Sequence, residues 1–213
     1  PDVYQLGTST TSALLANISR NTTDYRMDPS TGMINNLSVE YAGLGGDNKY
    51  ARFTTDHTWF TPLYKKLIFS TKLGFGYIQD VEGTKVPIDE KFYLGGMYAL
   101  RGFKSRTVSP TKTSASSGGR VYLGGNKEFY GNAEMTFPLL SEAGIKMVTF
   151  FDYGNAYGEN EKMFSSMYMS YGAGIRWASP LGPLRLEYGF PLNPRSGIDN
   201  RSGRLEFSIG SLF

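Results

Sequence analysis

The sequence lacks cysteine altogether, contains a single histidine and has no long hydrophobic run. Without cysteine, neither a disulfide framework nor a thiolate metal site can form. The longest apolar runs cover only a few residues, whereas a transmembrane helix needs about 20. The 22 basic and 19 acidic side chains nearly balance, so the charge does not indicate a nucleic-acid partner.

Signatures of enzymes are scarce too. The one histidine, His57, falls in a strand-like segment next to Asp56, but alternation along a strand places the two side chains on opposite faces. The sequence has no Gly-x-Ser-x-Gly nucleophile motif, and no close group of Asp, Glu and His has the spacing of metal ligands. We therefore expect a protein that is not an enzyme, with no catalytic residue, no metal and no cofactor.

Glycine and aromatic residues are abundant instead, with 26 Gly, 15 Tyr and 14 Phe, and polar and apolar residues alternate along much of the chain. In residues 126–137, Glu128 and Glu134 share one face, while Phe129 and Met135 share the other. A period of two predicts β-strands. Nine strands are predicted on this basis, at residues 13–23, 33–42, 49–60, 66–79, 125–138, 145–157, 166–178, 184–191 and 203–213.

Several of these strands have ten or more residues, whereas strands of soluble proteins most often have about 5–6. A tilted strand needs about 9–11 residues to cross a bilayer. We interpret residues 1–213 as one all-β domain, an antiparallel transmembrane β-barrel, with a long loop at about 80–124. Aromatic residues near the predicted strand ends are expected to form interfacial girdles: Trp59, Phe60, Tyr153, Tyr157, Trp177 and Phe190.

Three charged residues stand out in this arrangement. Glu134 and Asp152 fall on the polar face of neighbouring strands, and two acids placed there repel each other unless a cation lies between them. Arginine suits that position because its planar guanidinium can bond carboxylates bidentately. We expect the long loop to fold into the lumen and to place Arg101 against these acids. The alternative is that all three are ordinary hydrated lumen charges, and alternation alone favours neither.

The segment FYLGGMYALRGFKS (92–105), together with TFFDYGNAYG (149–158), GIRWASPLGPLRLEYGFPL (174–192) and the final FSIGSLF, resembles the BamA-like outer-membrane protein assembly factors of the bacterial surface-antigen superfamily. The resemblance implies an LRGF motif at the tip of a lumen-inserted loop, with Glu134 and Asp152 as its acidic partners. It also implies that residues 203–213 form the last strand of a seam. The residues concerned are Leu100, Arg101, Gly102 and Phe103 in the motif, and Leu205, Phe207, Ile209, Gly210 and Phe213 in the seam strand and terminal signal.

The implied function is the assembly and insertion of β-barrel proteins into the bacterial outer membrane, with the seam edge strand as a folding template. The implied partners are outer-membrane lipid, unfolded outer-membrane proteins as clients, and assembly-machinery lipoproteins that bind through POTRA domains. Barrels of this family have sixteen strands and are preceded by POTRA domains. With nine predicted strands and no POTRA domain, the chain resembles the C-terminal half of such a barrel, and the other strands would all be N-terminal.

Other functions stay open at this point. A polypeptide-translocating pore of the same superfamily also has such a loop tip. A passive porin-like channel shares the barrel but does not need the tip to be fixed by acids. A soluble sandwich or lipocalin-like protein is disfavoured by outward-facing residues such as Phe69 and Phe75. Nine strands leave two edges with unpaired backbone groups, so we expect the chain to close on itself or to self-associate.

Overall fold

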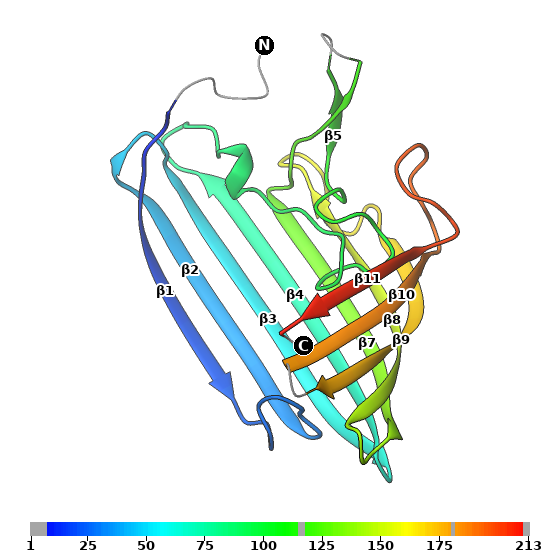
Figure 1. Ribbon diagram of the computed structural model, residues 1–213. Helices are drawn as coiled ribbons and strands as arrows, with labels where there is room; N and C mark the ends of the chain where they lie inside the picture. The colour runs from blue at the N-terminus through cyan, green and yellow to red at the C-terminus, as the bar shows by residue number, and fades with distance from the viewer. Residues whose placement is uncertain (1–7, 115–117, 180–181, 211–213) are drawn as a thin grey trace.

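The computed structural model describes residues 8–114, 118–179 and 182–210. In these residues nine antiparallel strands form one curved sheet around a long loop (Figure 1). Each strand pairs with its neighbours in the order β1-β2-β3-β4-β7-β8-β9-β10-β11. The strands are β1 (Thr11–Asn21), β2 (Gly32–Gly46), β3 (Tyr50–Tyr64), β4 (Leu67–Asp80), β7 (Lys127–Leu140), β8 (Ile145–Tyr157), β9 (Tyr168–Ser179), β10 (Gly182–Pro191) and β11 (Arg204–Ile209).

All nine predicted strands are present; β8 has the predicted ends, and the described ends of the others differ from the prediction by a few residues. Alternation fixes which face each side chain occupies. In β11, Leu205, Phe207 and Ile209 point to the convex face and are 58%, 61% and 62% exposed, while Ser208 points to the concave face and contacts the loop. An apolar convex face and a polar concave face, here called the lumen face, are typical of a transmembrane barrel. No helix in the described part of the chain is long and apolar enough to cross a membrane.

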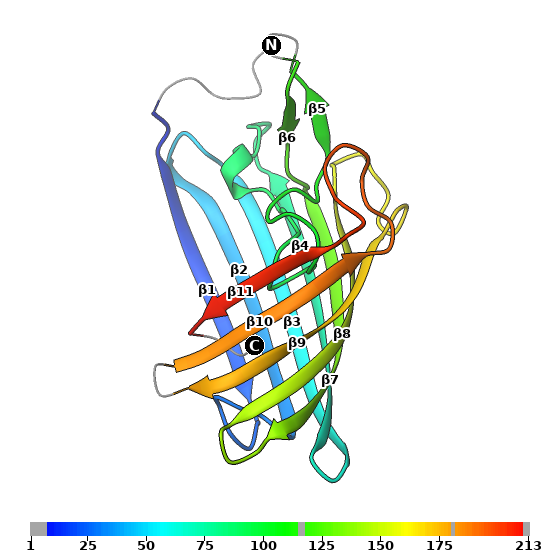
Figure 2. The same cartoon turned by 45° about the vertical axis from the view of Figure 1, so that its right-hand side comes forward.

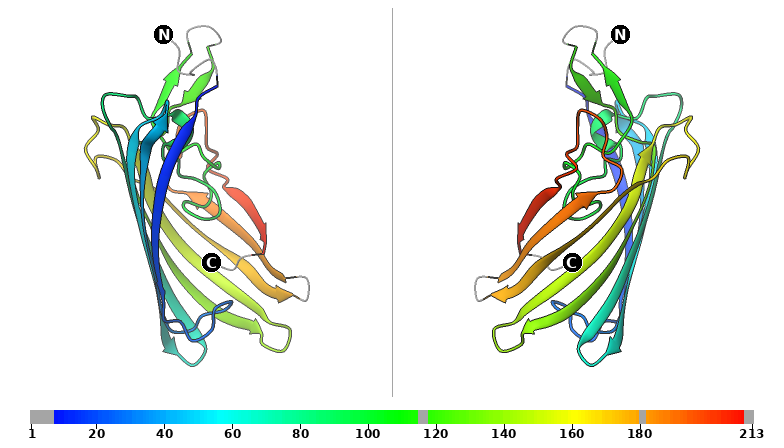
Figure 3. Two further views of the ribbon diagram at one scale, coloured as in Figure 1. Left: turned by 90° about the vertical axis from the view of Figure 1, so that its left-hand side faces the viewer. Right: turned by 90° about the vertical axis from the view of Figure 1, so that its right-hand side faces the viewer.

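The sheet is an open trough, with β1 and β11 at its two edges (Figure 3). Among the described residues, β1 pairs only with β2, and β11 pairs only with β10. Of the two expectations for the edges, closure of the chain on itself is therefore not seen in the described structure. Self-association stays a prediction.

The long loop joins β4 to β7 across residues 81–126 and fills the concave side of the trough (Figure 2); we call it the lumen loop. It contains one turn of 3₁₀-helix, η1 (Ile88–Glu90), and a small hairpin of β5 (Thr111–Thr113) and β6 (Arg120–Tyr122). The hairpin was not predicted, because three-residue strands are too short to show alternation. The buried apolar cluster lies between this loop and the strands and includes Phe92, Leu94, Leu100, Phe103, Val108, Tyr50 and Ile78.

The prediction of aromatic girdles is only partly right. Trp59 and Trp177 lie at the convex surface and are 37% and 39% exposed. Phe60 and Tyr157 are buried instead. Phe60 follows Trp59 directly and so points to the opposite, lumen face, and the Tyr157 hydroxyl donates a hydrogen bond to the Ser166 carbonyl in the β8–β9 connection.

Candidate functional site: a buried charge cluster at the loop tip

The tip of the lumen loop, Leu100–Phe103, is held in a tight turn. The Gly96 amide lies 3.0 Å from the Leu100 carbonyl and 3.1 Å from the Phe103 carbonyl, and the Leu100 amide donates back to the Gly96 carbonyl at 3.1 Å. These bonds pull both ends of the tip together. Arg101 is thereby directed away from the body of the loop and toward the sheet.

Arg101 is bound on several sides by carboxylates of the lumen face. Its Nε and Nη2 donate to the two oxygens of Asp152 on β8 at 2.7 and 2.5 Å, and its backbone amide donates to the same carboxylate at 3.0 Å. Its Nη1 donates to Glu134 on β7 at 2.6 Å and to Glu187 on β10 at 2.7 Å. The Arg101 side chain is only 2% exposed. One guanidinium therefore joins three strands of the sheet.

Two further arginines complete what we call the charge cluster: Arg101, Glu134, Asp152, Arg176, Arg185 and Glu187. Arg176 on β9 donates to Glu134 and to Glu187, at 2.8 Å in both cases. Arg185 on β10 donates to both oxygens of Glu187 at 3.0 Å. Three guanidinium groups thus face three carboxylates, and the cluster is electrically balanced only when the loop tip is in place.

Neighbouring groups fix the geometry around Arg101. The Arg101 guanidinium carbon lies 3.6 Å from the centre of the Phe150 ring, a position that favours cation–π attraction. The Asn132 amide donates to Asp152 at 2.8 Å and to the Ala99 carbonyl of the loop at 2.9 Å. Burial alone would lower the pKa of Arg101, but the adjacent Asp152 and Glu134 carboxylates outweigh it and raise that pKa well above the usual value. Arg101 is therefore a permanent cation.

The other residues of the LRGF motif have separate structural reasons. Leu100 and Phe103 are fully buried in the apolar cluster. Gly102 has φ +84°, and a Cβ placed on it would lie 2.8 Å from the backbone of Gly189 on β10. Only glycine allows this close approach of loop and strand. The motif therefore combines a cation, a backbone contact and two apolar anchors within four residues.

The loop also reaches the last strand. The Tyr98 hydroxyl is hydrogen-bonded to the Ser208 hydroxyl of β11 at 2.8 Å, and the backbone of Gly102 interacts with the Glu206 carboxylate of the same strand. Gly210 follows β11 with φ +101° and has open space where a Cβ would be. The predicted end of this strand at Phe213 lies outside the described residues.

The structure brings Arg101, Glu134 and Asp152 together, as expected from the sequence. The other members of the cluster and its supporting groups are not among the predicted site residues; they are Glu187, Arg176, Arg185, Asn132 and Phe150. The signal that could have found the charged ones is their lumen-face position in GIRWASPLGPLRLEYG. In the described residues no group of three or more His, Asp and Glu could hold a metal ion.

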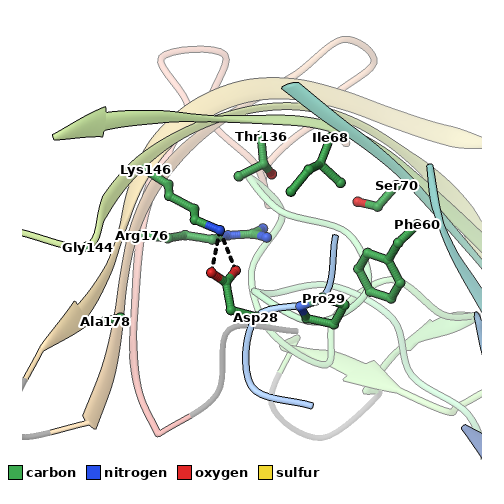
Figure 4. A pocket seen from close by; sticks show the side chains of 10 residues that line it. All are labelled: Asp28, Pro29, Phe60, Ile68, Ser70, Thr136, Gly144, Lys146, Arg176 and Ala178. Carbon is green, nitrogen blue, oxygen red and sulfur yellow. Dashed lines mark hydrogen bonds and ion pairs between the residues drawn. The ribbon is translucent and has the colours of Figure 1, made fainter. Parts of the chain in front are cut away.

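A further ion pair lies near the other end of the strands. The β1–β2 connection bends toward the lumen, where the Asp28 carboxylate lies 2.5 Å from Nζ of Lys146 on β8, and Pro29 is buried. Figure 4 shows both side chains lining a pocket with Phe60 and Arg176. Four strands separate β1 from β8 in the sheet, so this contact ties two distant parts of the sheet together across the lumen.

Comparisons with known proteins agree on one protein family. The whole chain, residues 1–213, matches the Omp85 superfamily domain. It is 31% identical to the outer membrane protein assembly factor BamA of Nitratidesulfovibrio vulgaris over 211 residues. This alignment covers 97% of this chain and 26% of the relative. It is 28% identical to the protein of the same name from Neisseria meningitidis, over 91% of this chain and 28% of the relative. The chain thus spans about a quarter of the length of these relatives.

The fold has a close counterpart among solved structures. BamA of Haemophilus ducreyi lacking POTRA domains 1–3 superposes with a TM-score of 0.80 and 24% identity, over 93% of this chain and 42% of that one. At this identity the match speaks for the fold alone, and it confirms the predicted antiparallel barrel architecture. The sequence relatives are named as outer-membrane proteins. At the level of the family, this confirms the predicted resemblance to outer-membrane assembly factors and the predicted location in the outer membrane.

Proposed function

Because the chain belongs to the Omp85 superfamily, we propose that it is part of an outer-membrane barrel that inserts and folds other β-barrel proteins. The observation that carries this proposal is the buried charge cluster that fixes the lumen loop to the sheet. A passive channel needs an open lumen, whereas this loop occupies the lumen and is bonded to β7, β8 and β10. The names of the sequence relatives, which are assembly factors, support the same function.

In this proposal β11 is the seam strand. An edge strand presents unpaired N–H and C=O groups on which an incoming strand can form a ladder. Gly210, at the end of β11, contributes no side-chain contact and so weakens pairing there. The loop holds the lumen face of β11 through Tyr98, so the docked tip keeps the template strand in position while its apolar face is directed to lipid.

The partners follow from the same proposal. Outer-membrane lipid surrounds the convex face, where Leu205, Phe207 and Ile209 are exposed. Unfolded outer-membrane proteins are the clients. Assembly-machinery lipoproteins would bind through POTRA domains. Among the described residues, all strands belong to the nine-stranded sheet or to the hairpin of the lumen loop, so these partners would contact other parts of the protein. The mechanism relies on backbone pairing and loop docking, and it uses no catalytic residue, nucleotide or metal.

Reconstitution of the intact protein in phospholipid vesicles tests the proposal. An unfolded outer-membrane protein is added, and the fraction that becomes protease-resistant is measured. Arg101→Ala is expected to lower this fraction severalfold, while Arg106→Ala, which alters an exposed arginine of the same loop, leaves it close to that of the parent. Equal effects of the two substitutions would overturn the assigned role of the loop tip.

The same vesicles separate the competing functions. A passive channel conducts small solutes without any effect on added client, and Arg101→Ala then changes only the solute flux. A polypeptide-translocating pore moves an added polypeptide into the vesicle interior and leaves it sensitive to protease enclosed there. Client that is folded in the bilayer, with solute flux at background, supports assembly.

A further inference from the structure

An arginine near the last strand, outside the charge cluster, also contacts the lumen loop. Arg195 lies in the β10–β11 connection (192–203) and forms a bidentate pair with Asp199 of the same connection, Nε to Oδ2 at 2.7 Å and Nη2 to Oδ1 at 3.0 Å. The backbone amide of Arg195 donates to Asp199 as well, at 3.1 Å. The two side chains are only 9% and 1% exposed. The connection therefore contains a largely buried guanidinium that is paired with a carboxylate of the same connection.

The remaining donors of Arg195 are directed at the lumen loop. Nη2 donates to the Thr107 hydroxyl at 2.7 Å, and Nη1 donates to the Thr107 carbonyl. Thr107 lies four residues beyond Phe103, and its hydroxyl also donates to the Lys104 carbonyl at 2.7 Å. Arg195 thus binds the segment through which the chain leaves the loop tip.

Arg195 also contacts the aromatic anchor of the motif. Its guanidinium carbon lies 5.7 Å from the centre of the Phe103 ring and 5.5 Å from that of Tyr168 on β9. The two rings pack edge to face at 5.7 Å. These distances lie within the range of cation–π attraction. One side chain therefore contacts the loop tip, the segment after it, a strand of the sheet and the connection that leads into β11.

We propose that Arg195 is a positioning residue that joins the β10–β11 connection to the lumen loop, so that the docked tip and the last strand are held as one unit. The chemistry of the contact suits a connection that opens and closes. Asp199 neutralises Arg195 whether or not the loop is present, whereas Thr107 supplies only uncharged acceptors. Separation of the loop leaves no unpaired carboxylate behind. This contact differs in that respect from the Arg101 site, where departure of the tip leaves carboxylates without their cation.

The inference deepens the proposed function and rests on it only for its effect on client assembly. The test of Arg195 itself needs no client. A single cysteine is introduced at Val108, which is fully buried in the loop, into the intact protein in phospholipid vesicles. The rate of maleimide labelling then reports opening of the loop, and hydrogen exchange of residues 192–209 reports the mobility of β11 and the connection before it.

Arg195→Gln is expected to raise the labelling rate at position 108 by roughly 10- to 100-fold, since charge-assisted hydrogen bonds are lost. Exchange in residues 192–209 should rise with it. Arg195→Lys, which keeps the charge but not the planar fork, should give an intermediate rate. Arg201→Gln is the matched control in the same connection, because Arg201 is exposed, and it should label as slowly as the parent.

Two results would overturn the inference. One is equal labelling of the Arg195 and Arg201 variants; the other is faster exchange in residues 192–209 without faster labelling at position 108. If Arg195→Gln also loses exchange protection in β7–β9, it fails to fold, and Thr107→Val then decides. Thr107→Val removes the hydroxyl that accepts from Arg195 and donates to the Lys104 carbonyl. Faster exchange in residues 192–209, on the Arg195 side of the contact, must therefore accompany faster labelling at position 108. The two proposals can fail separately. If the Arg195 variants label at position 108 as expected, but the Arg101→Ala protein folds added client normally, the positioning role of Arg195 is supported and the proposed function is refuted.

Discussion

Removal of the Arg101 side chain should undock the lumen loop far more than removal of its neighbour Arg106. In Arg101→Ala, Glu134 keeps its bond from Arg176, and Glu187 keeps its bonds from Arg176 and Arg185. The loss therefore falls mainly on Asp152, which loses both guanidinium bonds from Arg101 and keeps only uncharged donors, the backbone amide of residue 101 and the Asn132 amide. A buried charge left without its partner costs about 3–5 kcal/mol.

The control substitution removes much less. Arg106 is exposed, and its guanidinium carbon lies 4.6 Å from the centre of the Tyr93 ring. A cation–π contact at an exposed site contributes about 0.5–1 kcal/mol. The two variants should therefore differ by about 2–4 kcal/mol in the free energy of loop docking, which corresponds to a roughly 30- to 700-fold difference in the undocked population.

Maleimide labelling of the cysteine at position 108 measures this population directly, because the side chain at that position is buried when the loop is docked. A second substitution tests the assigned cause. Adding Asp152→Asn to Arg101→Ala replaces the unpaired carboxylate with a neutral amide and should recover part of the lost docking energy. The reasoning fails if Arg101→Ala and Arg106→Ala label equally fast, or if Asp152→Asn slows labelling of the parent and of Arg101→Ala equally.

Three further substitutions probe other contacts of the loop and the sheet. Gly102→Ala should destabilise loop docking by about 1–3 kcal/mol, because the added Cβ would meet the backbone of β10. Gly83 also has a positive φ but has open space around it, so Gly83→Ala is the control. Equal maleimide labelling of the two variants would contradict the argument from close approach. Tyr98→Phe removes a hydroxyl bonded to β11 and should speed hydrogen exchange of that strand by roughly 2- to 10-fold; unchanged exchange refutes the contact. Lys146→Met removes the partner of Asp28 and should speed hydrogen exchange in the β1–β2 connection. The loss of thermal stability should be small, since partly exposed ion pairs contribute about 0.2–1 kcal/mol. Hydrogen exchange as slow as in the parent would show that the pair does not hold this connection.

The strands could be predicted from sequence because alternation over ten or more residues is a strong local signal. The same alternation put Glu134 and Asp152 on the lumen face, and repulsion between them called for a cation. Choosing Arg101 as that cation needed the motif resemblance, since alternation says nothing about how a 46-residue loop folds. Gly102 is explained only by the structure, because its close contact is with a strand far along the sequence.

The rest of the cluster depends on distances that no local pattern carries. Glu187 on β10 reaches Arg101, and Arg176 on β9 bridges Glu134 on β7 and Glu187. These contacts depend on strand tilt and sheet curvature, which the sequence period does not specify. The position of Arg195 is less predictable still, since it lies in a connection without alternation.

The composition of the charge cluster bears on how firmly the loop is held. Burying several charges costs desolvation energy that their mutual attraction largely offsets, so a buried ionic cluster adds less net stability than an apolar core of equal size. Its geometry is nevertheless demanding, because Arg101 must meet carboxylates on β7, β8 and β10 at once. When the tip leaves, water can solvate these carboxylates again, which lowers the cost of opening. A loop fixed in this way docks in a defined position and leaves it at moderate cost, which is compatible with the proposed assembly function.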